Sequence, residues 1–340
     1  MNKKYQLLKN ILFSNFRRLE YPYKVTFAMT YKCNLRCKIC KIWQKDHKQE
    51  LSVDEIGLIF KNLKNLSWLD LTGGEISARE DLIDVVCAIT KNSNRLAVFH
   101  ISTNGQLPDR IYLLVRKLIK LGVIPIVNIG LDGPQKVNDE LRGKDGAYDS
   151  SIETYRMLKS IPKGYYYISC TISNSNIDHL DELVSNLKNI SLFSSSDLHF
   201  NIFHNSSHYY QNDNINEISN LKIERLKKYF LLCKRGNIIK AILGNLYLEG
   251  LFKYLKGNRF PVECQALNST CFINPYGLVF PCGIYDNIIG NLKDCNYNIN
   301  KLWNSGHSIK SREFINQKRC PGCWSPCEAY PAILGHLCVV

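Results

Sequence analysis

Apolar residues recur along the chain in two alternating patterns. Short β-branched and aromatic runs indicate strands in six places, at residues 25–31, 67–72, 96–103, 124–131, 165–173 and 198–204. Between these runs, apolar residues repeat at spacings of three and four, as at Ile56, Ile59, Phe60 and Leu63, which predicts amphipathic helices. Strands that alternate with helices predict βαβ units, and hence a parallel sheet with right-handed crossovers.

Two architectures can accommodate six such units. One is a doubly wound sheet, and the other is a partial (β/α)6 TIM-like barrel. The six units occupy about 200 residues, whereas a complete eight-fold barrel needs roughly 250, so the partial barrel is favoured. In either architecture ligands bind at the carboxyl ends of the strands. We therefore expect an α/β fold whose functional residues lie in the loops that follow the strands.

The pattern changes near residue 210. Two helices are expected up to about residue 256, and eight of the fourteen cysteines lie in the turn-rich segment after residue 260. We expect four parts: a basic amphipathic segment (1–24), an α/β core domain (25–210), a helical connection (211–260) and a cysteine-rich domain (261–340).

Composition narrows the class of protein. The 340 residues carry 44 Lys+Arg against 30 Asp+Glu, a formal net charge of +14, but the basic residues are scattered, which favours a solvated surface over nucleic-acid binding. No run approaches the ~18 apolar residues of a membrane span, and no signal peptide is recognised, so a cytoplasmic location is expected. Thiols stay reduced there, and fourteen cysteines then indicate metal binding or catalysis. For segment 1–24, docking on its own domain is favoured over peripheral contact with anionic lipid.

Three cysteines follow the first predicted strand directly. Cys33, Cys37 and Cys40 have the spacing C-x3-C-x2-C. Structural zinc sites use four protein ligands, so three thiolates suit an iron cluster that keeps one position open. A zinc site completed by a distant ligand is the alternative.

This spacing, in a loop after the first strand, resembles the signature of the radical S-adenosylmethionine (radical SAM) enzymes. The resemblance implies that Cys33, Cys37 and Cys40 hold a [4Fe–4S] cluster whose fourth iron binds S-adenosylmethionine. It also implies that a donor such as flavodoxin or ferredoxin reduces this cluster. Reduction of the cluster then yields a 5′-deoxyadenosyl radical that takes hydrogen from the substrate. The protein then supplies binding and orientation.

A glycine-rich loop extends the resemblance. Gly73, Gly74 and Glu75 follow the second predicted strand and are similar to the family's Gly-Gly-Glu-Pro loop, with Ile76 in place of proline. The resemblance implies that this loop lines the methionine part of the cofactor. Its glycines allow close backbone approach, and its carboxylate suits an ammonium group.

The loops after the third and fourth predicted strands continue the series. Ser102 opens a Ser-Thr-Asn-Gly turn, and Arg142 stands at the family's spacing after the fourth strand. Gly130 replaces the serine of the family's Ser-x-Asp-Gly motif, so a ribose contact is expected from Ser102 or Asn128 instead. A guanidinium at Arg142 is suited to a carboxylate.

A second group of cysteines lies near the C-terminus. Its candidate metal ligands are Cys264, Cys271, Cys282, Cys320, Cys323 and Cys327. Such spacings, with tight turns, are typical of metal or cluster ligands. They resemble the SPASM and Twitch extensions of radical SAM enzymes, which bind one or two auxiliary [4Fe–4S] clusters. The C-x2-C-x3-C run lacks one cysteine of the two-cluster form, so one cluster is expected, or two if Cys295 substitutes.

The resemblance implies an oxidoreductase that oxidises or modifies a small molecule or a peptide, with the auxiliary cluster assisting. Gly283 follows Cys282 where sulfatase-activating relatives have aspartate, which disfavours that activity. The contrasting hypothesis is a basic, zinc-stabilised protein that binds nucleic acid without catalysis. It leaves the Gly-Gly-Glu loop unexplained. The sequence does not identify a catalytic acid, base or hydrogen donor.

Overall fold

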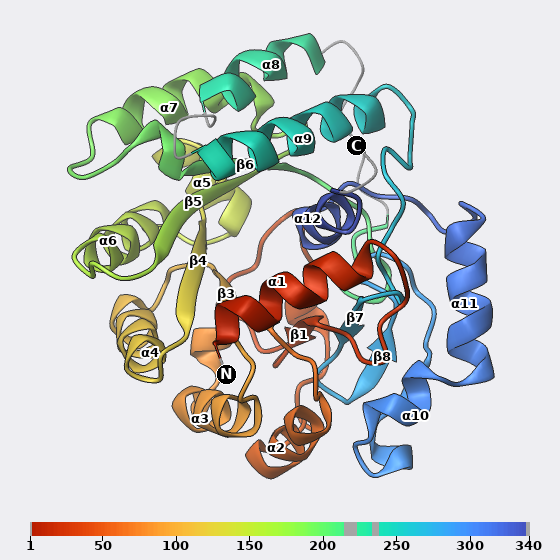
Figure 1. The fold of residues 1–340 in the computed structure, drawn as a ribbon. Coiled ribbons are helices and arrows are strands. Elements are labelled where there is room, and N and C mark those ends of the chain that lie inside the picture. Colours follow the sequence, from red (N-terminus) through yellow and green to blue (C-terminus); the bar gives the residue numbers. More distant parts are fainter. Residues whose placement is uncertain (1, 214–222, 233–237, 338–340) are drawn as a thin grey trace.

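A computed structural model describes residues 2–213, 223–232 and 238–337 (Figure 1). Six parallel strands follow the chain in order around the sheet. They are β1 (Lys24–Ala28), β2 (Trp68–Thr72), β3 (Val98–Thr103), β4 (Ile124–Gly130), β5 (Tyr165–Ile172) and β6 (Leu198–Ile202). All six coincide with predicted strands. The sheet curves into a partial barrel, so the predicted fold class is confirmed.

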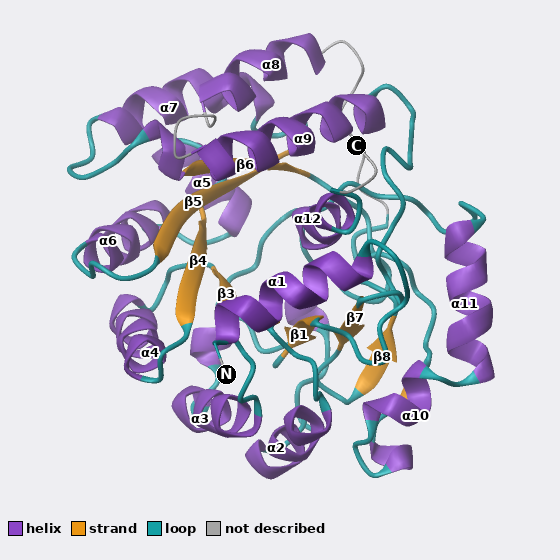
Figure 2. Cartoon of the chain, viewed as in Figure 1, coloured by secondary structure: helices purple, strands orange, loops and turns teal. Residues whose placement is uncertain are grey.

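Helices cover the outside of the sheet, as Figure 2 shows in purple around the orange strands. They are α2 (Val53–Asn62), α3 (Leu82–Asn92), α4 (Pro108–Lys120), α5 (Gln135–Arg142), α6 (Ala147–Lys159) and α7 (Leu180–Lys188). Helix α2 begins at a capping box in which Ser52 and Glu55 bond reciprocally, and it buries Ile56, Ile59 and Phe60 as predicted. Helix α4 buries Ile111, Leu114 and Leu118 on one face, whereas Leu121 lies past the helix end and is exposed.

The strands alternate between an apolar outer side and a polar inner side. In β3 and β4, Phe99, Ile101, Val127 and Ile129 are fully buried in the main hydrophobic core. The residues between them point to the opposite side of the sheet, because successive strand residues alternate in direction. Several of these inner residues are polar and only half-buried. The barrel interior is therefore a polar, partly accessible space that can receive a ligand.

The cysteine-rich region continues the same sheet. Strand β7 (Thr270–Ile273) pairs in parallel with β1, and β8 (Leu278–Phe280) and β9 (Gly290–Asn291) follow antiparallel. The remaining helices are α8 (Ile223–Leu232), α9 (Ile238–Leu255), α10 (Ile299–Trp303), α11 (Gly306–Asn316) and α12 (Pro326–Leu334). One hydrophobic core includes residues of the barrel and of this region. The domain boundaries expected at 210 and 260 stay a prediction.

The N-terminal segment forms helix α1 (Lys3–Ser14) and docks on the barrel, as expected, through a largely polar side. Gln6, Asn10, Ile11 and Ser14 are buried, and the Asn10 amide nitrogen donates to the Ser67 hydroxyl at 2.7 Å. Within the described residues, none of the helices combines the length and the apolar character that crossing a membrane requires.

Candidate active site

The three N-terminal cysteines lie in the loop that leaves the carboxyl end of β1. Burial raises the pKa of the Cys33 thiol to about 11 and that of Cys40 to about 12, and neighbouring thiols act in the same direction. Burial also raises the pKa of Cys37. None of the three forms a disulfide. The thiols are close enough to influence one another, and they remain partly accessible from the barrel opening.

Neighbouring loops hold this cysteine loop by backbone hydrogen bonds. The Lys38 amide donates to the Leu141 carbonyl at 2.8 Å, at the end of α5. The Lys41 amide donates to the carbonyl of Tyr210 at 2.8 Å. Two distant segments of the chain therefore fix a loop that has no regular secondary structure along most of its length.

The glycine-rich loop packs directly against the cysteine loop. The Gly74 amide donates to the Thr30 carbonyl at 2.7 Å, and the Glu75 amide donates to the Lys32 carbonyl at 2.8 Å. A Cβ atom at Gly73 would lie 2.3 Å from the Thr30 carbonyl oxygen, and one at Gly74 would lie 2.4 Å from that of Lys32. Both positions therefore require glycine, since the protein's own backbone occupies the space.

The Glu75 carboxylate is buried and joins two loops. Its Oε1 accepts from the Ser77 amide at 2.9 Å and from the Thr103 hydroxyl at 2.8 Å, and its Oε2 accepts from the Asn104 amide at 2.6 Å. The Asn104 side chain in turn donates to the Asn34 side chain at 2.7 Å. Glu75 thus links the loop after β2, the loop after β3 and the cysteine loop.

Arg142 is largely buried beside the cysteines and pairs with Asp132 at 2.8 Å. Burial alone would lower the pKa of its guanidinium, but Asp132 and neighbouring thiols, led by Cys37, outweigh burial and raise it. A Cβ atom at Gly130 would lie 2.5 Å from this guanidinium. The glycine that replaces the family's serine therefore makes room for Arg142. The guanidinium Nε has no hydrogen-bond partner among the described residues.

Polar side chains line the barrel interior near this loop. Ser102 and Asn128 are register partners on β3 and β4, and the Asn128 Oδ1 atom has no hydrogen-bond partner among the described residues. Farther around the barrel, the Asn201 amide nitrogen donates to the Ser169 hydroxyl at 2.8 Å. An unpaired buried acceptor such as Asn128 Oδ1 indicates a place where a ligand group can donate.

Tyr209 is a site residue that the sequence did not single out. It follows β6, and its hydroxyl lies 2.8 Å from the Thr72 hydroxyl and 3.1 Å from the Gly73 carbonyl oxygen. Its ring packs against that of Tyr210, with centroids 4.5 Å apart. A tyrosine pair outside any strand or helix pattern carries no local signal, so only the fold could place it beside the glycine loop.

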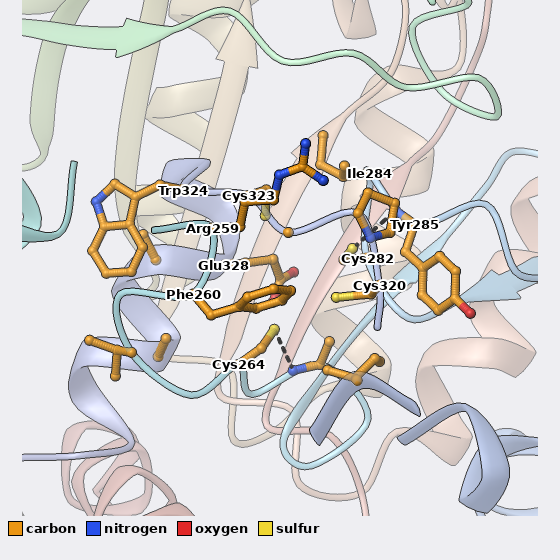
Figure 3. A pocket seen from close by; sticks show the side chains of 17 residues that line it. Arg259, Phe260, Cys264, Cys282, Ile284, Tyr285, Cys320, Cys323, Trp324 and Glu328 are labelled. Atoms are coloured by element: carbon orange, nitrogen blue, oxygen red, sulfur yellow. Dashed lines mark hydrogen bonds between the residues drawn. The ribbon is translucent and has the colours of Figure 1, made fainter. Parts of the chain in front are cut away.

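A second site lies in the cysteine-rich region, where four cysteines line one pocket (Figure 3). They are Cys264, Cys282, Cys320 and Cys323, and they lie around the ring of Phe260. Burial raises the pKa of all four thiols, that of Cys323 to about 11. Gly322 makes the tight turn between two of them with φ +72°, where other residues are strained.

The other candidate cysteines do not line this pocket. Cys271 is fully buried in β7, and the thiol of Cys327 has Asp70, Lys24 and Glu328 among its nearest charges. Cys295 lies elsewhere, and its thiol donates to the Leu292 carbonyl at 3.4 Å. The structure thus brings together four of the six cysteines expected in this region. Cys233 and Cys338 lie outside the described residues.

A buried ionic network joins the barrel strands to the second site. Lys24 in β1 contacts Asp70 at 2.9 Å and Glu328 of α12 at 4.0 Å, and Glu328 also lines the four-cysteine pocket. Burial raises the pKa of Asp70, but Lys24 and His100 outweigh it and hold that pKa below its ordinary value. Burial also raises the pKa of Glu328, and at this residue burial outweighs the opposite effect of Lys24.

The donor sets suit groups larger than one ion. In the described part of the chain, no three His, Cys, Asp or Glu side chains are arranged to hold a single metal ion. Thiolates spread around a pocket or along a loop fit an iron–sulfur cluster, whose ligands bind separate iron atoms. Both sets consist of thiols alone, the ligand type that such clusters use.

Comparison with known proteins identifies the core. Residues 27–187 match the model of the radical SAM superfamily. These residues form a radical SAM domain. The match includes the cysteine loop, the glycine loop and Arg142, and it confirms the predicted family and an enzyme rather than a nucleic-acid-binding protein without catalysis.

Curated relatives agree with this assignment. This radical SAM protein is 35% identical over 132 residues to the Fe-coproporphyrin III synthase of Methanosarcina barkeri, across 38% of this chain and 32% of the relative. It is 24% identical over 324 residues to the radical SAM cyclopropyl synthase TigE of Paramaledivibacter caminithermalis, across 88% of this chain and 65% of that enzyme. The matches thus span about one third and just under two thirds of these relatives.

Solved structures have the same fold. The crystal structure of Streptococcus suis SuiB bound to the precursor peptide SuiA superposes with a TM-score of 0.62 at 16% identity, and it covers 92% of this chain and 70% of SuiB. At this identity the likeness concerns the fold. It extends well beyond residues 27–187 and so includes the cysteine-rich region.

Proposed function

We propose that this radical SAM enzyme holds a [4Fe–4S] cluster on Cys33, Cys37 and Cys40 and binds S-adenosylmethionine at the adjoining carboxyl ends of the strands. The observation that carries the proposal is the convergence of the glycine loop, Glu75 and Arg142 on one cysteine loop. The bound pair would supply a 5′-deoxyadenosyl radical that abstracts hydrogen from the substrate.

The cofactor-binding residues have two roles in this proposal. Ser102 and Asn128 contact S-adenosylmethionine from the barrel interior, where the Asn128 oxygen is free to accept a hydrogen bond. Gly73, Gly74 and Glu75 shape its binding place. The backbone of the cysteine loop packs against the two glycines, and the loop after β3 donates to the Glu75 carboxylate. Arg142 acts as a largely buried cation beside the cysteines, and its free Nε is available to donate a hydrogen bond to S-adenosylmethionine.

The proposal includes one auxiliary [4Fe–4S] cluster, held by Cys264, Cys282, Cys320 and Cys323. This ligand set excludes Cys271, Cys295 and Cys327, which do not line the pocket. An auxiliary cluster close to the barrel can accept the electron that remains on a substrate after hydrogen abstraction. The enzyme is then an oxidoreductase that draws electrons for radical formation from a flavodoxin or ferredoxin.

We propose a peptide as the substrate. One relative is the sporulation killing factor maturation protein SkfB of Bacillus subtilis, and SuiB was solved with a precursor peptide. A small molecule is the alternative, because an AdoMet-dependent heme synthase of Methanosarcina barkeri is 23% identical across 80% of this chain.

Two measurements test the cofactor assignment. Iron and sulfide are counted on anaerobically reconstituted protein, and 5′-deoxyadenosine is measured after dithionite reduction with S-adenosylmethionine. We expect about eight irons per chain, as for two four-iron clusters. The Cys33→Ala/Cys37→Ala/Cys40→Ala variant should keep about four irons and form no 5′-deoxyadenosine.

The matched variant Cys320→Ser/Cys323→Ser should also keep about four irons but still cleave S-adenosylmethionine without substrate. Cys87→Ala, in helix α3, controls for loss of a thiol outside both sites. Cleavage that persists in the triple variant would refute the core assignment. Zinc in place of iron would refute the radical mechanism.

A further inference from the structure

Helix α1 presents an apolar stripe away from the protein. Tyr5, Leu8 and Leu12 follow at spacings of three and four and share one side of the helix, and Phe16 continues the line beyond its end. Their exposed fractions are 62%, 59%, 51% and 73%. Large apolar side chains exposed in a row are unusual on a soluble surface and mark an interaction site.

The buried side of α1 lies opposite this stripe. Gln6, Asn10 and Ser14 repeat at spacings of four and face the barrel. Ile11 and Leu7 also pack inward, in a cluster with Leu19 and Tyr23. The helix nevertheless departs from the usual order, in which large apolar residues pack inward, because four of them face water. Asn10 donates to Asn65 and Ser67 of the barrel, whereas Gln6 and Ser14 bond within the helix. None of these contacts involves the exposed apolar residues, so they do not account for the stripe.

Basic residues flank the stripe. Lys4, Lys9 and Arg17 are exposed, and none forms an ion pair with a carboxylate in the described part of the chain. Lys9 and Arg17 lie on either side of Phe13, at 5.4 and 4.9 Å from the ring centroid. Residues 1–19 contain no Asp or Glu. The surface is therefore apolar along its middle and purely cationic at its margins.

The position of α1 leaves the active site free. It packs against Asn65 and Ser67, which precede β2, and so lies at the amino ends of the strands. The cysteine loop lies at their carboxyl ends. In Figure 1, α1 crosses the front of the molecule and no other helix covers it.

We propose that α1 docks the enzyme on an anionic lipid surface, with Tyr5, Leu8, Leu12 and Phe16 inserted among the headgroups and Lys4, Lys9 and Arg17 paired with their phosphates. Charge complementarity supports a lipid surface as the partner. The apolar and aromatic row matches the acyl chains of a bilayer, and the cations beside it match anionic headgroups. The active site then faces away from the membrane. This inference is independent of the cofactor assignment.

Vesicle flotation of the full chain tests the inference. Wild-type protein should float with phosphatidylcholine–phosphatidylglycerol vesicles, should not float with phosphatidylcholine alone, and should be released as salt rises. Leu8→Ser/Leu12→Ser/Phe16→Ser should lower partition more than ten-fold, because each side chain loses apolar burial. Lys4→Gln/Lys9→Gln/Arg17→Gln should lower it as well, by roughly five-fold for each cation.

Leu113→Ser is the matched control, since Leu113 is 59% exposed on α4, far from α1 along the chain. It should bind vesicles like wild type. An unchanged urea midpoint in each variant separates surface effects from unfolding. Failure of the wild type to float would overturn the inference. A dimer in solution that the apolar variant abolishes, without flotation, would assign the stripe to a second copy of the chain and overturn it too.

Discussion

Replacing Gly74 by alanine tests the packing of the glycine loop on the cysteine loop. The new Cβ would lie 2.4 Å from the Lys32 carbonyl oxygen and 2.6 Å from that of Tyr31, whereas ordinary contacts begin at 3.4 Å. The difference, 3.4 minus 2.4, is 1.0 Å, and it must be taken up by backbone movement. Lys32 immediately precedes Cys33, so the displacement reaches the first cluster ligand.

A displacement of this size should impair catalysis more than stability. Misplacement of reacting groups by ~1 Å can lower a rate about 100-fold, and overpacking costs about 1–3 kcal/mol of unfolding free energy. We expect 5′-deoxyadenosine formation to fall by one to two orders of magnitude while the protein stays folded. The measurements are the initial rate of formation, iron content and urea unfolding.

Gly57→Ala is the matched control, because the new Cβ there meets its nearest neighbour at 3.5 Å, an ordinary contact, inside helix α2. It should keep full activity. If Gly74→Ala also keeps a rate within a factor of about two of wild type, the loops are not as tightly coupled as the geometry requires.

Three further predictions concern buried groups. Glu75→Gln replaces an acceptor for the Asn104 amide by a donor, which should cost about 1–3 kcal/mol in urea unfolding and slow S-adenosylmethionine cleavage. Lys24→Met removes the buried cation that lies between Asp70 and Glu328 and should cost about 3–5 kcal/mol. Because the folded pKa of Asp70 is lowered, this loss should be complete above about pH 4 and shrink as pH falls below it, which urea titrations at several pH values would detect. Cys271→Ala should leave iron content unchanged, and a loss of about four irons would return Cys271 to the ligand set.

The strands of the core could be predicted because their signal is local. Runs such as 124–131 are long enough to show an apolar pattern, and the helix faces repeat at a fixed period. Strands β7 to β9 have only two to four residues and were missed. Periodicity cannot distinguish so short a segment from a turn, and β7 is a strand because β1 offers it an edge.

The roles of site residues were harder to predict than their positions. Sequence spacing singled out Glu75, Gly130 and Arg142, but their contacts join residues far apart in the chain. The exchange of a serine for Gly130 suggested a lost hydroxyl contact, whereas in the fold it provides space for a guanidinium. Cys271 stays a predicted ligand from its spacing, although it lies in β7 and does not line the four-cysteine pocket.

The pairing of β7 with β1 has a consequence for dissecting this protein. A chain shortened to the barrel alone would leave β1 as a bare edge, with its amide and carbonyl groups free to pair with another molecule. The shortened chain would also lack Glu328, which lies 4.0 Å from the buried ammonium group of Lys24. We expect such a fragment to aggregate. The two cysteine sites therefore have to be expressed and purified together in one chain.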